Sequence, residues 1–178
     1  MKQTIRLSSM LTAALSIAVV APVTAEEFKT RLTGYQETPL TINTAGSGEF
    51  KAKIVHGGTE IDYELTYRDL SSPVRQAHIH FGRPAITGGI VLFLCTNLTP
   101  PPGVPAPQAC PAAPATITGT LTAANVIPVP GQGIDAGAEG LAEMIEAMHA
   151  GAAYANVHTV TFPSGEIRGR LGPIRDKH

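Results

Sequence analysis

The stretch Glu60-Ile61-Asp62-Tyr63-Glu64-Leu65-Thr66-Tyr67 decides the fold class of this chain. Its polar and apolar residues alternate, and because successive side chains of a β-strand point to opposite faces, the pattern predicts a half-buried strand. Similar runs, separated mostly by Gly, Pro, Ser or Asn, lie at residues 28–32, 48–55, 76–81, 89–94, 116–121, 153–158 and 166–171. About eight short strands at this spacing indicate an all-β antiparallel sandwich or barrel rather than a parallel α/β sheet.

One segment departs from the strand pattern and predicts an inserted amphipathic helix. Between residues 136 and 150 the apolar residues recur at helical spacing, beside glutamates. They are Leu141, Met144, Ile145 and Met148, and the glutamates are Glu139, Glu143 and Glu146. Gly151 is placed to end this helix.

The N-terminal segment predicts export. Lys2 and Arg6 precede an apolar run at residues 10–20, and Val23-Thr24-Ala25 supplies small residues for cleavage. We therefore expect a secretory signal peptide at residues 1–25 and one domain at residues 26–178, located in the periplasm or secreted. No cysteine directly follows the cleavage position and no second long apolar run occurs, so we expect no membrane anchor.

Composition and motifs narrow the classes of function. The formal net charge is −1 and 15% of residues are charged, which gives no basic field for nucleic acid, so no nucleic-acid partner is expected. The sequence also lacks the G-x-S-x-G, phosphate-loop and H-E-x-x-H motifs of hydrolases, nucleotide-binding proteins and metalloproteases. These observations favour binding over enzymatic turnover.

The two cysteines, Cys95 and Cys110, predict a disulfide, because paired cysteines in an exported protein are normally oxidised. The proline-rich segment 96–109 between them is incompatible with helix or central strand and predicts a long loop. A bridge closing roughly 15 residues stabilises a fold by about 3 kcal/mol in the chain-entropy model. A thiolate metal site is disfavoured, since the close C-x-x-C spacing is absent.

Histidines supply the candidate metal ligands. His78 and His80 lie two residues apart and share one face of the predicted strand 76–81. If the strand carrying His158 lies beside it, the three imidazoles can form an open site for copper or zinc. Their nitrogens should then converge within about 4 Å of one another. Tyr154 and Asn156 share the strand face of His158 and are candidates to hold the second nitrogen of a ligand.

Two other interpretations of these histidines stay open. In the first, His78 and His80 are structural and hydrogen-bond to the backbone or to Glu166 and Arg168. Glu166 and Arg168 would point to one side of their strand as a salt-bridge or hydrogen-bond pair. In the second, the protein is a redox enzyme, which would need an open metal site and a proton donor. Glu37 and Glu166 are the candidate acid and base, but neither lies in an acid–base motif.

Six segments in order resemble the CHRD domain family, which is named for repeats of the secreted antagonist chordin. The first, Leu32–Pro39, resembles the opening L-x-G-x-x-E-x-P of that family. The others are residues 44–48, the strand that ends at Tyr67, and residues 77–80, 154–159 and 163–169. The resemblance implies an immunoglobulin-like or Greek-key β-sandwich. It also suggests a protein-interaction domain without metal, in which the Cys95–Cys110 loop and the helix present the recognition surface.

A more local likeness concerns the first histidine pair. His78-Ile79-His80-Phe81-Gly82 resembles the stretch that supplies copper ligands in copper/zinc superoxide dismutases, through its two alternating histidines and nearby glycine. The bridging histidine and the zinc-site aspartate of that family have no counterpart here. The likeness therefore implies a smaller copper or zinc site rather than dismutase activity.

Overall fold

Eight antiparallel strands form one continuous sheet in the computed structural model, which describes residues 26–172. The strands are β1 (Glu26–Thr33), β2 (Ser47–Val55), β3 (Glu60–Arg68), β4 (Val74–Phe81), β5 (Gly89–Thr96), β6 (Ala115–Thr122), β7 (Ala153–Thr159) and β8 (Ile167–Leu171). Each coincides with one run expected from the sequence, so the all-β class and the strand number are confirmed. The signal peptide expected at residues 1–25 lies outside the described residues.

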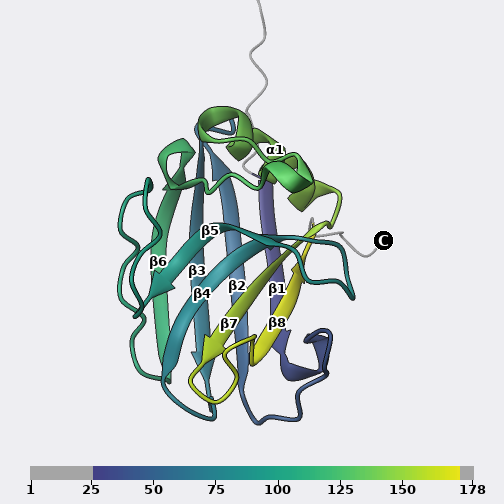
Figure 1. Ribbon diagram of the computed structural model, residues 1–178, viewed down its shortest axis with the longest axis vertical. Coiled ribbons are helices and arrows are strands. Elements are labelled where there is room, and N and C mark those ends of the chain that lie inside the picture. The colour runs from purple at the N-terminus through teal and green to yellow at the C-terminus, as the bar shows by residue number, and fades with distance from the viewer. Residues whose placement is uncertain (1–25, 173–178) are drawn as a thin grey trace, which may run out of the picture.

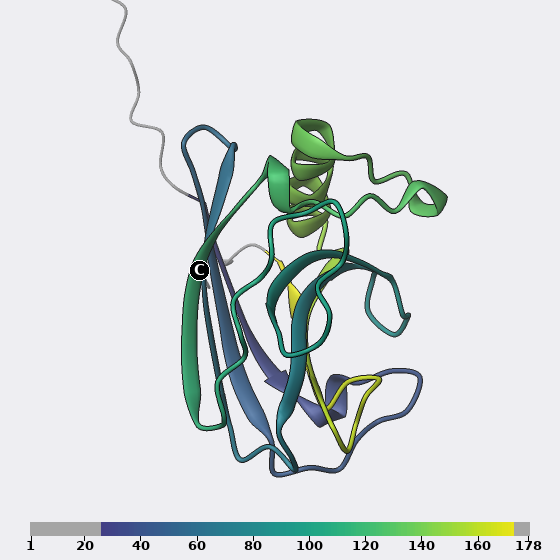
Figure 2. The ribbon, with the colours of Figure 1, turned by 60° about the vertical axis from the view of Figure 1, so that its left-hand side comes forward.

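The sheet curves until its two halves face each other. The strand order is β5-β4-β7-β8-β1-β2-β3-β6, and the halves join where Thr33 of β1 pairs with Arg168 of β8. Figure 1 shows β5, β4, β7 and β8 crossing in front of β6, β3, β2 and β1. Figure 2 shows these two layers edge-on. The first half carries both histidine strands side by side.

The core lies between the two halves and follows the alternation in the sequence. Phe50 of β2 pairs with Leu65 of β3, and both are fully buried. Ile79 of β4 and Val157 of β7 face them from the other half and belong to the same apolar cluster. Because alternate residues of a strand point to opposite faces, His78, His80 and His158 lie on the outer face of their half.

The expected helix is α1 (Gly137–His149), and it covers one open end of the curved sheet (Figure 1). Its buried face carries Leu141, Met144 and Met148, as the helical spacing predicts. Gly151 follows with φ +64°, a left-handed conformation that favours glycine after a helix. Within residues 26–172, no helix is both long and apolar enough to cross a membrane. Three short 3₁₀ turns complete the elements: η1 (Gly34–Gln36), η2 (Ala123–Asn125) and η3 (Pro130–Gln132).

The predicted disulfide between Cys95 and Cys110 is present. It ties the long loop after β5 to the end of that strand. In the same region, the Tyr63 hydroxyl of β3 donates to the Leu94 carbonyl of β5 at 2.7 Å, and Gln108 of the loop donates to that hydroxyl at 2.7 Å. The loop therefore helps to join the two halves at the free edge of β5.

Candidate metal centre

Three histidines meet on the outer face of β4 and β7. In the register of these neighbouring strands, His78 pairs with Asn156, and Gln76 pairs with His158, which makes His158 a diagonal neighbour of His78. The His78 ring centroid lies 4.8 Å from that of His158 and 5.3 Å from that of His80. Two segments remote in sequence thus contribute to one cluster, as expected from the sequence if their strands were adjacent.

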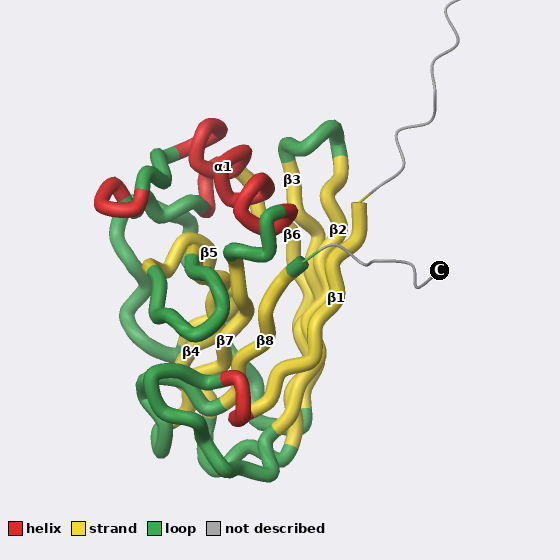
Figure 3. Tube along the Cα trace, turned by 90° about the vertical axis from the view of Figure 1, so that its right-hand side faces the viewer, coloured by secondary structure: helices red, strands yellow, loops and turns green. Residues whose placement is uncertain are grey.

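Loops bury the cluster although it lies outside the core. His78 is 0% exposed, His80 5% and His158 6%. The segment after β4 reaches His80 through the carbonyl of Gly88, and the segment after β7 reaches His158 through the carbonyl of Pro163. Figure 3 views the side of the molecule on which loops lie over β4, β7 and β8. The cluster is therefore a closed polar layer between the sheet and its loops.

Backbone carbonyls determine which ring nitrogen of two histidines carries the proton. Nδ1 of His80 lies 3.0 Å from the Gly88 carbonyl oxygen, and Nδ1 of His158 lies 3.1 Å from the Pro163 carbonyl oxygen. Since a carbonyl can only accept, each Nδ1 is the donor, and each Nε2 keeps a free lone pair. Metal-binding histidines commonly use this arrangement, because the second hydrogen bond orients the ring and raises its basicity.

Four buried nitrogens of the cluster have no hydrogen-bond partner within the described residues. They are both ring nitrogens of His78, Nε2 of His80 and Nε2 of His158. Leaving one buried polar group unsatisfied costs about 1–3 kcal/mol, so several such groups at one point need a physical explanation. One nitrogen from each of the three rings lies within 4.8 Å of the others. A cation that accepts one lone pair from each ring would satisfy three of these four nitrogens together.

The spacing of the cluster is slightly wider than a bound ion requires. Ligands at about 2.0–2.1 Å from a tetrahedral ion are about 3.4 Å apart. The separation of up to 4.8 Å also exceeds the limit of about 4 Å expected from the sequence. The widest pair must therefore close by about 1.4 Å before both nitrogens can reach one ion. The residues thus fit copper or zinc after a local contraction.

Burial keeps the three rings neutral, which is the form that binds a metal. It lowers the pKa of His80 to about 4 and the pKa of His158 to about 4. Burial, with His158 and His80 close by, holds the pKa of His78 far below its ordinary value. At neutral pH none of the rings needs to lose a proton before it can bind a metal.

Tyr154 positions His80, although not by the route expected from the sequence. The two rings are stacked with centroids 4.6 Å apart and an angle of 4° between their planes. The Tyr154 hydroxyl accepts a hydrogen bond from the Gly88 amide at 3.1 Å, and the Gly88 carbonyl in turn accepts from His80. Tyr154 therefore orients His80 by stacking and by holding Gly88, rather than by a direct hydrogen bond to the imidazole.

Asn156 has a different set of partners from the one expected. Its amide nitrogen donates to a Glu37 carboxyl oxygen at 2.6 Å and to the Ile167 carbonyl at 2.9 Å. None of its hydrogen bonds within residues 26–172 reaches a histidine, because the amide faces β8 and the segment after β1. Burial raises the pKa of Glu37 to about 7. The L-x-G-x-x-E-x-P motif contains this glutamate, but nothing local in the sequence linked it to Asn156.

The expected pairing of Glu166 with Arg168 is wrong for the described part of the chain, and neither residue hydrogen-bonds a histidine there. Glu166 precedes β8, and its carboxylate accepts hydrogen bonds from Thr44, Thr159, and the hydroxyl and amide of Ser71. The guanidinium of Arg168 lies 3.4 Å from the ring centroid of Tyr154 and donates to the Ile86 carbonyl at 2.8 Å. The two side chains are thus held by different loops.

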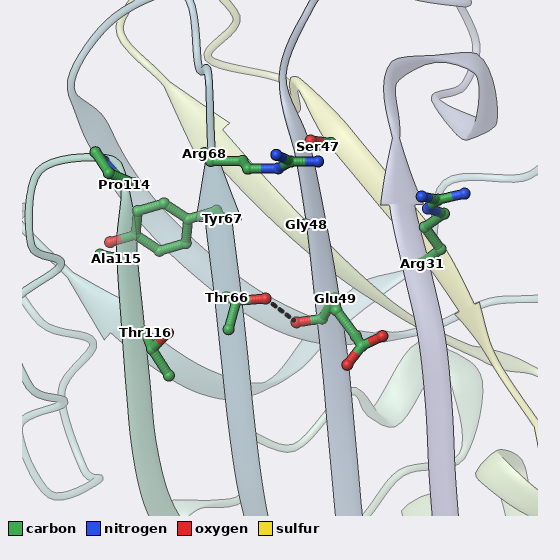
Figure 4. A pocket seen from close by; sticks show the side chains of 10 residues that line it. All are labelled: Arg31, Ser47, Gly48, Glu49, Thr66, Tyr67, Arg68, Pro114, Ala115 and Thr116. Carbon is green, nitrogen blue, oxygen red and sulfur yellow. Dashed lines mark hydrogen bonds between the residues drawn. The ribbon is translucent and has the colours of Figure 1, made fainter.

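A surface groove on the other half of the sheet is far less suited to a metal. Figure 4 shows this groove, about 550 Å³ in volume, across the outer faces of β1, β2, β3 and β6. Arg31 and Arg68 border it, both exposed to solvent, and no histidine lines it. Its one acidic residue, Glu49, forms ion pairs with Lys29 and Lys51. The groove therefore offers no metal-ligand set comparable to the histidine cluster.

The fold and the site together define a class: a small antiparallel all-β domain with a disulfide and a buried histidine cluster under its loops. Comparison with known proteins agrees with the resemblance noted in the sequence. The chain belongs to the CHRD domain family, whose model matches residues 28–171. No curated protein and no solved structure matches the chain.

Proposed function

We propose that this protein is an exported CHRD-domain binding module that holds one copper or zinc ion through His78, His80 and His158. The observation that carries the proposal is the convergence of three buried imidazoles, each of which has at least one ring nitrogen without a hydrogen-bond partner within the described residues. Imidazole is a good ligand for both metals, and three such ligands leave a fourth position open. The bound ion would supply Lewis acidity, or redox chemistry in the case of copper.

The surrounding residues support ligand binding by the cluster. The carbonyls of Gly88 and Pro163 orient two rings with Nε2 free, and Tyr154 supports the ring of His80. The local likeness to copper/zinc superoxide dismutases makes copper the first metal to test. Redox catalysis is not part of the proposal.

Metal content and titration test the proposal. The purified protein is analysed by mass spectrometry for copper and zinc, then stripped with a chelator and titrated with each metal. We expect about one ion per chain in the wild type and its loss in the double variant His78→Ala/His80→Ala. His56→Ala is the matched control, since the His56 side chain is 71% exposed and lies outside the cluster. A folded wild type that binds neither metal contradicts the proposal.

A protein-interaction function without metal is the second candidate. Tyr35 is 70% exposed and Leu40 is 73% exposed, and both lie in the segment between β1 and β2. Exposed large apolar residues close together in sequence are typical of recognition surfaces. If the metal titration shows no binding, the wild type should capture an extracytoplasmic protein. The variant Tyr35→Ser/Leu40→Ser should not capture it.

The finer descriptions of fold and location belong to the same proposal. We regard the two facing halves as the layers of an immunoglobulin-like Greek-key sandwich. The Tyr63–Leu94 hydrogen bond, which joins β3 to β5, supports the packing of these halves against each other. Disulfides persist in oxidising compartments, so the Cys95–Cys110 bridge supports a location in the periplasm or the medium. Fractionation of the producing cells distinguishes these two destinations.

A further inference from the structure

A second cavity lies beside the histidine cluster and has a different chemical character. It has a volume of about 460 Å³, within the usual range for small-molecule sites. The segments 35–41 and 82–85 form its walls together with β7 and β8. Two arginines and one glutamate line it, namely Arg168, Arg170 and Glu37. None of the three cluster histidines is among its lining residues.

Arg168 is the unusual group in this cavity. The residue is 4% exposed, yet it takes part in none of the ion pairs found within residues 26–172. One terminal nitrogen, Nη2, donates to the carbonyls of Ile86 at 2.8 Å and Arg83 at 3.5 Å. No described residue accepts a hydrogen bond from its Nε or Nη1. A buried charge without a counter-ion is costly, and the face of Tyr154 compensates for it only in part.

We infer that this cavity binds a small molecule carrying an oxyanion group, a carboxylate or a phosphate, which pairs with the guanidinium of Arg168. The planar fork of an arginine matches both oxyanions and binds them with paired hydrogen bonds. Arg170 lines the same cavity and adds a second positive charge. The ligand would supply the counter-ion that the described residues do not.

Glu37 does not take this role. The Glu37 carboxyl is near enough to Arg168 for their charges to interact, but the two side chains form no ion pair, and the carboxyl accepts a hydrogen bond from Asn156 instead. Because burial raises the pKa of Glu37 to about 7, a large fraction of the carboxyl is protonated near neutral pH. In that form it can donate a hydrogen bond to the bound oxyanion. The cavity thus remains positively charged, which favours an anion over a neutral ligand.

The inference is independent of a metal in the histidine cluster. Tyr154 contacts both the Arg168 guanidinium and the His80 ring, so the two sites are neighbours. The anion, however, binds to groups that are present in the metal-free protein. The test is therefore made on chelator-treated protein, where failure of the metal proposal has no influence on the result.

Calorimetric titration of the chelator-treated protein with succinate and with inorganic phosphate, at constant ionic strength, tests the inference. We expect saturable binding of at least one probe, and the stronger probe identifies the oxyanion. Arg168→Gln should raise its dissociation constant about tenfold or more, since it removes a charge-assisted pair. Arg31→Gln, at the exposed arginine in the groove of Figure 4, is the matched control and should change it less than about twofold.

A second variant covers the case in which Arg168→Gln does not fold. Thr41 is exposed and lines the cavity, so Thr41→Tyr should obstruct the cavity without removing any charge, with a similar loss of binding. The inference is overturned if neither probe binds the folded wild type. It is also overturned if the folded Arg168→Gln variant, or Thr41→Tyr in its place, binds the probe as tightly as the wild type.

Discussion

Lowering the pH from 7 to 5 is expected to destabilise the metal-free protein through its histidine cluster. Burial lowers the pKa of His80 and of His158 from 6.5 to about 4 in the folded state. In the unfolded chain both rings take up a proton near pH 6.5, whereas the folded protein keeps them neutral. Stability contributed by these groups is therefore present above pH 6.5 and is lost as the pH falls toward 4.

The size of the effect follows from these values and from one opposing group. Between pH 7 and pH 5, His80 and His158 each lower the free energy of unfolding by about 2 kcal/mol. Burial raises the pKa of Glu37 from 4.5 to about 7, so the folded state gains a proton in this window and recovers about 2 kcal/mol. His78 acts in the same direction as the other histidines. The net loss is thus about 2 kcal/mol or more.

Urea denaturation of chelator-treated protein at pH 7 and pH 5 measures this loss. Glu37→Gln removes the opposing group, so its loss between the two pH values should be larger than that of the wild type by about 2 kcal/mol. His56→Ala should behave as the wild type, since that ring is exposed. The reasoning is refuted if the wild type is more stable at pH 5 than at pH 7, or if Glu37→Gln leaves the pH dependence unchanged.

Three further predictions concern stability. Replacing both Cys95 and Cys110 by alanine should lower the free energy of unfolding by about 3 kcal/mol in urea, and a reductant should then have no additional effect on the variant. In Gly88→Ala the new Cβ would lie 1.7 Å from a backbone carbonyl oxygen of β4, so the melting temperature should fall and zinc binding should weaken. Gly131→Ala, where a Cβ meets nothing within 4 Å, should not show either change. Tyr63→Phe removes the hydroxyl that joins β3 to β5 and should cost about 1–3 kcal/mol in the same urea assay; no loss would mean that this bond contributes little.

The elements of this fold were predictable because their signals are local. The alternation of Ile61, Tyr63 and Leu65 with polar residues predicted β3, since side-chain direction in a strand depends only on neighbouring positions. The helical spacing of Leu141 and Met144 predicted α1 in the same way. The disulfide followed from the cysteine count and the expected export. The pairing of His78 with His80 on one face was likewise a property of a single strand.

The contents of the site depended on contacts between remote segments, and no local pattern encodes those. The sheet order, with β7 between β4 and β8, determined that His158 joins the other two histidines. The loop after β1 brought Glu37 to Asn156, which turned that amide away from the histidines. The loop after β4 gave Arg168 carbonyl partners in place of Glu166. The pKa of a group depends on how deeply the group is buried, and its hydrogen-bond partner depends on which loop covers it. Only the tertiary structure decided these two properties, because burial and loop position both come from contacts between segments remote in sequence.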